Sequence, residues 1–187
     1  MRDFQMPGRS AVFAANGMCA TSHPLAASAA IDILKAGGNA VDAAIAGAVL
    51  LGFCEPQMTG LGGDCFVLFK PAGSEDIHAL NGSGRAPMGL DAAALRARGL
   101  TTMPLYAPEA VTIPGAVDAF CKLSADWGRM DLAQTLAPAI HYAEEGVPVA
   151  PRVANDWAEA EHLLQGRARE TLLLNDKALT AGQIFRA

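Results

Sequence analysis

The sequence predicts an α+β fold, because helical segments flank a hairpin of short strands along the chain. Residues 25–35 and 39–53 have the periodicity and capping signals of two helices. Two short runs, 65–69 and 76–80, have the length and composition of strands that could pair as a hairpin. Because further helices follow, this order suits a layered α+β architecture better than a repeating βαβ unit.

The composition describes a globular chain and argues against nucleic-acid and membrane partners. Of the 187 residues, 51% are hydrophobic and 18% are charged, so a sizeable core can be buried. The net charge of −5 offers no basic footprint for nucleic acid or for an anionic membrane. The longest strongly apolar run, 43–54, falls short of the roughly 20 residues that a membrane span needs. We therefore expect a small molecule or a protein as partner.

The cysteines, the histidines and the N-terminus bear on location and metal content. The four cysteines are too scattered for a C-x-x-C pair and are expected to be buried thiols. The four histidines show no metal-ligand spacing with one another or with the cysteines. Residues 1–16 lack the basic start, apolar stretch and cleavage site of a secretory signal peptide. These observations predict a cytoplasmic protein without a bound metal.

Capping residues define the first two helices. Ser22 can cap the first helix, and the pair Gly37–Gly38 supplies its stop. Asn39 then caps the second helix, with Asp42 three residues on in a capping-box arrangement. Residues 43–53 are apolar all round, so this helix is expected in a packed layer between other elements.

The remaining elements are predicted from turn residues and periodicity. Val111–Pro114 is a candidate third short strand, and the last residues, 172–187, could belong to another helix that ends without a cap. The chain is therefore expected to be part of a longer one. Further helices are predicted over 91–98, 115–126, 131–145 and 151–165.

The glycine-rich segment Gly60–Gly63 could cradle a phosphate, but its context argues otherwise. A dinucleotide-binding loop needs the order strand, G-x-G-x-x-G, helix, and a P-loop ends in Gly-Lys-Ser or Gly-Lys-Thr. In this sequence the order is helix, glycines, strand. A tight turn required by close backbone packing is therefore the favoured interpretation.

The loop after the second strand holds two candidate ligand contacts, Ser83 and Arg85. Ser83 lies between two glycines but outside the G-x-S-x-G pattern, so a turn serine or a ligand-holding oxygen is favoured over a nucleophile. Arg85 could grip a carboxylate through two hydrogen bonds, although an arginine that leaves a sheet is more often in a surface ion pair.

Two other polar residues, His23 and Glu55, are expected to be structural. A lone histidine at a helix start more often caps or packs than catalyses. A carboxylate beside a glycine-rich turn can accept several backbone N–H bonds, which would make Glu55 a brace. No paired carboxylates, Cys/His pair or Ser/His/Asp set stands out, so spacing alone reveals no reaction.

Several strings occur in an order that is typical of one family. They are Ala20-Thr21-Ser22-His23-Pro24-Leu25-Ala26, Gly37-Gly38-Asn39-Ala40-Val41-Asp42-Ala43-Ala44, Thr59-Gly60-Leu61-Gly62-Gly63-Asp64, Ile113-Pro114-Gly115-Ala116-Val117, Leu136-Ala137-Pro138-Ala139-Ile140 and Ala143-Glu144-Glu145-Gly146. In this order they resemble the gamma-glutamyltranspeptidase family, and the resemblance runs from about Pro7 to the end.

The resemblance implies an N-terminal-nucleophile hydrolase with an αββα sandwich, made as one precursor that cleaves itself into two subunits. Residues 1–187 would be a single partial domain, the helix-rich N-terminal portion of the large subunit. In the family a new N-terminal threonine attacks gamma-glutamyl amides such as glutathione, with its own α-amino group as base and no cofactor. No Thr-Thr-His type cleavage site occurs in this chain, so it would hold no catalytic residue and would be inactive alone.

The resemblance also implies partners and substrate contacts. The expected partners are the acyl amide substrate, the remainder of its own precursor and a second copy in a possible homo-oligomer. Alignment on Ala86-Pro87 puts Ser83 where transpeptidases carry the arginine that binds the glutamyl α-carboxylate, and Arg85 follows two positions later. Ser83 and Arg85 are therefore the predicted substrate-binding residues. The alternatives are a cephalosporin or glutaryl amide acylase of the same family and a non-catalytic truncated remnant.

Overall fold

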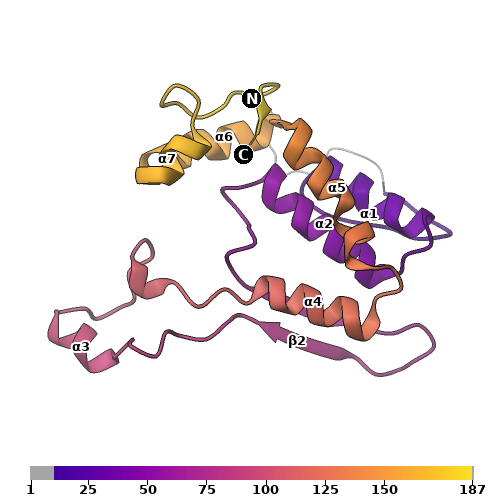
Figure 1. The fold of residues 1–187 in the computed structure, drawn as a ribbon, viewed down its shortest axis with the longest axis horizontal. Coiled ribbons are helices and arrows are strands. Elements are labelled where there is room, and N and C mark those ends of the chain that lie inside the picture. Colours follow the sequence, from indigo (N-terminus) through magenta and orange to yellow (C-terminus); the bar gives the residue numbers. More distant parts are fainter. Residues whose placement is uncertain (1–10, 187) are drawn as a thin grey trace. The chain divides into compact units, whose positions relative to one another are not determined.

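The computed structural model describes residues 11–186, which divide into two compact units. The first unit takes in the chain up to Gly60 and from Trp127 onward, and the second is Leu61–Asp126. The helices drawn in Figure 1 are α1 (Pro24–Lys35), α2 (Ala40–Cys54), α3 (Ala92–Ala97), α4 (Ala116–Trp127), α5 (Leu132–Glu145), α6 (Pro151–Ala160) and α7 (Gly166–Leu172). The strands are β1 (Cys65–Phe69), β2 (His78–Gly82), β3 (Val147–Pro148) and β4 (Ile184–Phe185), and short 3-10 turns lie at Pro108–Ala110 and Glu161–Leu163.

The residues that cap α1 and α2 in the structure are those that the sequence predicted, with one exception. The capping box of α2 is confirmed, because the Asn39 side chain accepts the Asp42 N–H and the Asp42 carboxylate accepts the Asn39 N–H. Gly37, with φ of +100°, ends α1 as predicted. The cap of α1 is His23 and not Ser22, since the helix begins at Pro24 and the imidazole Nδ1 accepts the Leu25 N–H at 3.2 Å.

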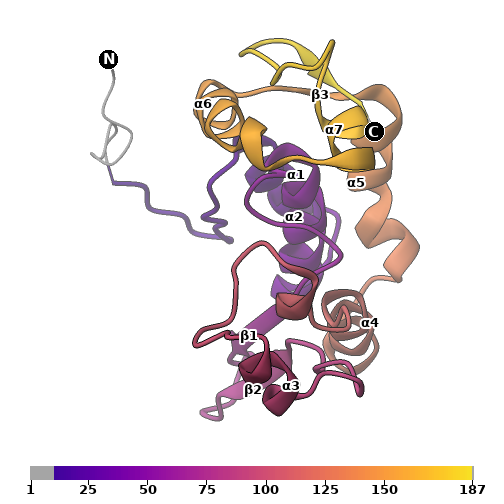
Figure 2. The same cartoon turned by 90° about the vertical axis from the view of Figure 1, so that its left-hand side faces the viewer.

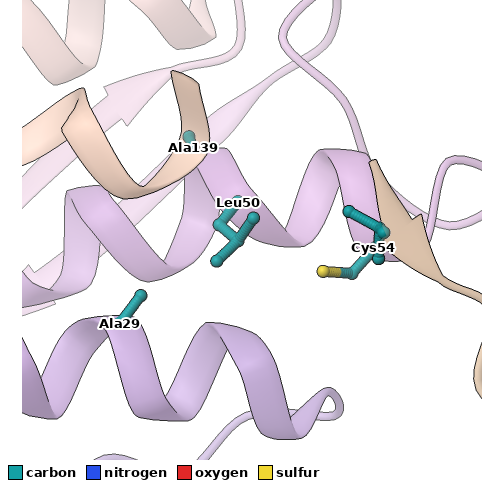
Figure 3. Close-up of a cluster of buried hydrophobic side chains, with 5 residues drawn as sticks. Ala29, Leu50, Cys54 and Ala139 are labelled. Carbon is teal, nitrogen blue, oxygen red and sulfur yellow. The ribbon is translucent and has the colours of Figure 1, made fainter. Parts of the chain in front are cut away.

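The core of the first unit lies where α2 packs against α1 and α5. Figure 3 shows Leu50 of α2 between Ala29 of α1 and Ala139 of α5, and the Leu50 side chain is completely buried. The apolar helix α2 is covered along most of its length, as expected, and its exposed positions are Ala40, Ala44 and Ala48. Figure 2 gives a second view of these three helices side by side. Burial of small side chains lets the helices approach closely.

The C-terminal residues complete the first unit through a second apolar cluster. Trp157 of α6 meets Phe185 of β4 edge-to-face with 5.0 Å between the ring centroids. β4 pairs antiparallel with β3, which sequence patterns did not reveal. The predicted helix over 172–187 is wrong, because a tight turn with positive φ at Asn175 and Asp176 leads the chain into β4. The predicted helix 151–165 is interrupted as well, since α6 ends at Ala160.

The second unit contains the predicted hairpin with a shifted second strand. β1 pairs antiparallel with β2, and the register runs from Cys65 opposite Gly82 to Phe69 opposite His78. The prediction of 76–80 for the second strand was therefore wrong by two residues. The connection is longer than predicted, and within it the Asp76 N–H donates to the Ser74 hydroxyl and Lys70 pairs with Glu75. Helix α4 runs beside β2, where Ala119 lies against Gly82 (Figure 1).

The candidate third strand, Val111–Pro114, is also wrong. This segment has no strand geometry and follows a 3-10 turn. It packs instead against the loop after β2, where single hydrogen bonds join the two segments without a ladder. Within residues 11–186, no helix combines the length and the apolarity that crossing a membrane requires.

Candidate functional site

The loop after β2 holds both predicted substrate-binding residues in a fixed backbone. The Ser83 N–H donates to the Asn81 side-chain oxygen at 3.0 Å, and the Ser83 carbonyl accepts the Thr112 hydroxyl at 3.0 Å. The Arg85 carbonyl accepts the Ile113 N–H at 2.9 Å. Two of these bonds tie the loop to Thr112 and Ile113, which belong to the segment that leads into α4. The backbone of Ser83 and Arg85 is therefore fixed against that segment.

Glycines allow the loop to lie directly against its neighbour. Gly84 has φ of +74°, a conformation that favours glycine, and an added Cβ would overlap the Ile113 carbonyl. A Cβ on Gly115 would overlap the backbone of Gly82 and Gly84. The glycines of this loop and of the segment that it contacts are therefore required by backbone packing, independently of any ligand.

The side chains of Arg85 and Ser83 differ in what they offer a ligand. Arg85 is exposed, and its guanidinium makes no ion pair or hydrogen bond within residues 11–186. Arg98 of the same unit, in contrast, pairs with Glu109 at 2.6 Å. The Ser83 hydroxyl is half-buried and donates to the Gly84 carbonyl at 3.3 Å. The surface ion pair considered for Arg85 is therefore not formed in the described structure, and its guanidinium can meet an anion.

The glycine turn before β1 supports the start of α4. The Gly63 carbonyl accepts the N–H groups of Gly115 and Ala116 at 3.2 and 3.0 Å. At its other end the turn folds back on α2, since a Cβ on Gly52 would come within 3.3 Å of the Gly60 Cα. This close approach agrees with the predicted tight turn.

A polar cluster at the start of α1 joins residues that lie far apart in the sequence. The Ser22 hydroxyl donates to the Glu55 carboxylate at 2.7 Å, and Glu55 is buried. Glu55 is a brace, as predicted, but its geometry differs from the expectation. Its backbone carbonyl, and not its carboxylate, accepts the N–H groups of Met58 and Thr59.

The same cluster sets the protonation of His23 and Cys54. Burial lowers the pKa of His23, and the nearby negative charge of Glu55 partly opposes this shift. Burial and Glu55 together raise the pKa of Cys54 to about 12, so Cys54 is a thiol at neutral pH. The Ser22 hydroxyl bonds the carboxylate while the imidazole caps α1, so these residues do not form a nucleophilic triad.

No metal centre is assembled from the described residues. Between residues 11 and 186, no three His, Cys, Asp or Glu side chains gather in a way that could hold an ion.

The Ser22–Glu55 hydrogen bond could not be predicted from the sequence, because the two residues are 33 positions apart and share no motif.

Comparisons with known proteins match the chain over nearly its whole length. The sequence profile described as gamma-glutamyltranspeptidase matches residues 26–187. The glutathione hydrolase proenzyme of Bacillus subtilis (strain 168) is 31% identical over 172 residues, which are 89% of this chain and 29% of that protein. The oxamate amidohydrolase proenzyme of Klebsiella pneumoniae is 37% identical over 183 residues, which are 91% of this chain and 33% of that protein.

A solved structure supports the same relationship. The crystal structure of cephalosporin acylase from Bacillus halodurans superposes with a TM-score of 0.89 at 44% identity, over 99% of this chain and 36% of that one. The predicted α+β fold class is confirmed by this likeness. The chain spans about a third of the length of these relatives.

Proposed function

The chain belongs to the gamma-glutamyltranspeptidase family, and we propose that it is the N-terminal portion of the large subunit of a precursor enzyme that hydrolyses or transfers acyl groups from amides. The profile match over residues 26–187 carries this proposal. Two of its relatives are named as proenzymes, in agreement with a precursor that extends beyond the residues of this chain.

The nucleophile lies outside this chain in our proposal. An N-terminal threonine, exposed by cleavage of the precursor, attacks the amide carbonyl, and its α-amino group takes the hydroxyl proton. Water or an amino acid then resolves the acyl-enzyme. The pair Thr101–Thr102 is followed by Met103 and so lacks the Thr-Thr-His pattern. This chain contributes substrate binding, and alone it is inactive.

Arg85 binds a carboxylate of the acyl group in this proposal. The exposed guanidinium and the hydrogen bonds at the Ser83 and Arg85 carbonyls support this role. A guanidinium can hold a carboxylate with two charge-assisted bonds, whereas the neutral Ser83 hydroxyl offers one weaker bond. The family match favours a gamma-glutamyl amide such as glutathione as the donor, with Arg85 on its carboxylate and Ser83 in a minor contact.

A second candidate is an acylase for glutaryl-type amides. The 44% identity to a cephalosporin acylase favours it. So does Ser83 at the position where transpeptidases are expected to carry an arginine. A glutaryl group has the terminal carboxylate but lacks the α-amino group of a glutamyl group, so Arg85 could serve either donor.

Turnover of two anilides by the full-length protein tests the proposal. We expect gamma-glutamyl p-nitroanilide to release nitroaniline with a higher kcat/KM than glutaryl p-nitroanilide. Turnover of only the glutaryl compound would contradict the gamma-glutamyl specificity and favour the acylase. Turnover of neither, by protein that has cleaved its precursor, would contradict amide acyl transfer for both donors.

Location and assembly are also proposals. We place the enzyme in the cytoplasm, and the free thiols of Cys19, Cys54, Cys65 and Cys121 agree with a reducing compartment. The proposed partners are the remainder of its precursor and a second copy in a homo-oligomer.

A further inference from the structure

His23 is held as a neutral imidazole with one defined tautomer. Its side chain is 4% exposed, and Nδ1 accepts the Leu25 N–H at 3.2 Å as the N-cap of α1. Because a neutral imidazole has one donor and one acceptor nitrogen, the proton resides on Nε2. The buried Nε2 has no hydrogen-bond partner within residues 11–186.

Glu55 supplies the negative charge near His23, and Arg152 of α6 lies within electrostatic range of Glu55. α1 packs against α2, whose ionisable groups at this end are Cys54 and Glu55. Asp42 belongs to the first turn of α2 and is bonded to backbone N–H groups there. On α1 itself, Asp32 and Lys35 form an exposed pair in the last turn. Glu55 is thus the anion that acts on His23, and its Oε2 already accepts the Ser22 hydroxyl.

We propose that His23 is a pH-sensitive lock on the start of α1. Protonation would turn Nδ1 from an acceptor into a donor, directly facing the Leu25 N–H donor. The helix would lose its cap, and a positive charge would be buried without a hydrogen-bond acceptor at Nε2. Opening of the first turn of α1 relieves both penalties, so acidification loosens this turn while the neutral imidazole keeps it closed.

The direction of the pH dependence follows from linkage. Burial lowers the pKa of His23 in the folded state below its ordinary value of about 6.5. The closed turn therefore binds fewer protons than the open one between these two pKa values, and its stability rises with pH. The stabilisation is complete above about pH 6.5 and is lost as the pH falls through the pKa of the folded state.

Hydrogen exchange in the full-length protein measures this opening. For a peptide covering residues 21–35, we expect the protection factor, corrected for the intrinsic rate, to fall about threefold to tenfold between pH 7.5 and 5.5. His23→Asn keeps an oxygen acceptor for the Leu25 N–H but cannot be protonated, so its protection factor should change less than twofold over that range.

The matched control is His141→Asn, which removes an exposed histidine of α5 in the same unit. This variant should retain the pH dependence of the unsubstituted protein. Protection of residues 21–35 that is independent of pH in the unsubstituted protein would overturn the proposal, whether or not the variants fold. Equal pH dependence in a folded His23→Asn protein would overturn it as well.

Discussion

The two units of this chain differ in how they place their large apolar side chains. In the first unit, Leu50 of α2 is fully buried between α1 and α5. In the second unit, Phe66 and Leu68 of β1 are 67% and 76% exposed on one face of the hairpin. The first unit therefore has a core of its own. The second unit contains a two-stranded sheet with unpaired edges, which has α4 beside it and leaves the Phe66 and Leu68 face uncovered.

The polar groups show the same contrast. Asp42 of the first unit is fully buried and accepts backbone N–H groups from Asn39 and Arg129. Arg85 of the second unit is exposed and has no partner in the described part of the chain. The first unit thus uses its buried polar group for stability, whereas the second unit carries the exposed guanidinium that we propose binds substrate.

Thiol labelling should give the largest difference between the units. Cys54 of the first unit is buried with a pKa of about 12, whereas Cys121 on α4 is exposed, so the expectation that all four cysteines are buried was wrong. Because the thiolate is the reactive form, we expect Cys54 in the folded full-length protein to react more than a thousandfold slower than an ordinary thiol near pH 8. Mass spectrometry after a pulse of iodoacetamide measures this. Rapid labelling of Cys54 before unfolding would contradict its burial.

Truncation of one leucine in each unit should separate their contributions to stability. Leu50→Ala removes a completely buried side chain and should lower the free energy of unfolding of the full-length protein by about 2–5 kcal/mol. The matched change Leu68→Ala, on the exposed face of β1, should cost less than about 0.5 kcal/mol if that face is also open in the full-length protein. Denaturant titration measures both. A large loss for Leu68→Ala would indicate that another part of the full-length protein covers the hairpin.

The capping box of α2 should contribute slightly less to the free energy of unfolding than the buried side chain of Leu50. Asp42→Asn removes the charge that accepts the Asn39 and Arg129 N–H groups in a buried setting. We expect the free energy of unfolding to fall by about 2–3 kcal/mol, because hydrogen bonds to a charged group are the stronger class. Asp126→Asn is the control, because Asp126 lies on the exposed face of α4 in an ion pair with Lys122, and the change should cost less than about 0.5 kcal/mol. Equal denaturation midpoints for Asp42→Asn and Asp126→Asn would contradict a stabilising role of the buried Asp42 carboxylate.

Local signals predicted the helices better than the strands. The caps at Asn39 and Gly37 act within a few residues, so the bounds of α1 and α2 could be derived from the sequence. The shift of β2 and the irregular path of Val111–Pro114 depend on backbone bonds between distant residues, such as Ile113 to Arg85. No periodicity encodes such a bond, and the third strand was therefore wrongly predicted.

The candidate site was only partly visible in the sequence. Turn residues predicted a glycine-rich loop at Ser83 and Arg85, and the structure adds the positive φ of Gly84 and the partners of the loop backbone. The Ser22–Glu55 contact and the cap role of His23 depend on the way α1 packs on α2, which the sequence does not specify locally. The substrate-binding roles of Ser83 and Arg85 stay predictions.

Steady-state kinetics of Arg85→Ala in the full-length, cleaved protein tests most directly whether the hairpin unit carries substrate recognition. The variant should lower kcat/KM for the better anilide by roughly tenfold to a hundredfold, mostly through KM, at about 1.4 kcal/mol per decade. Ser83→Ala should cost less than tenfold, since one neutral hydrogen bond contributes about 1 kcal/mol. Arg96→Ala, an exposed arginine of α3 in the same unit, is the control and should have no effect. A kcat/KM for folded Arg85→Ala within about twofold of the unsubstituted protein would contradict the account.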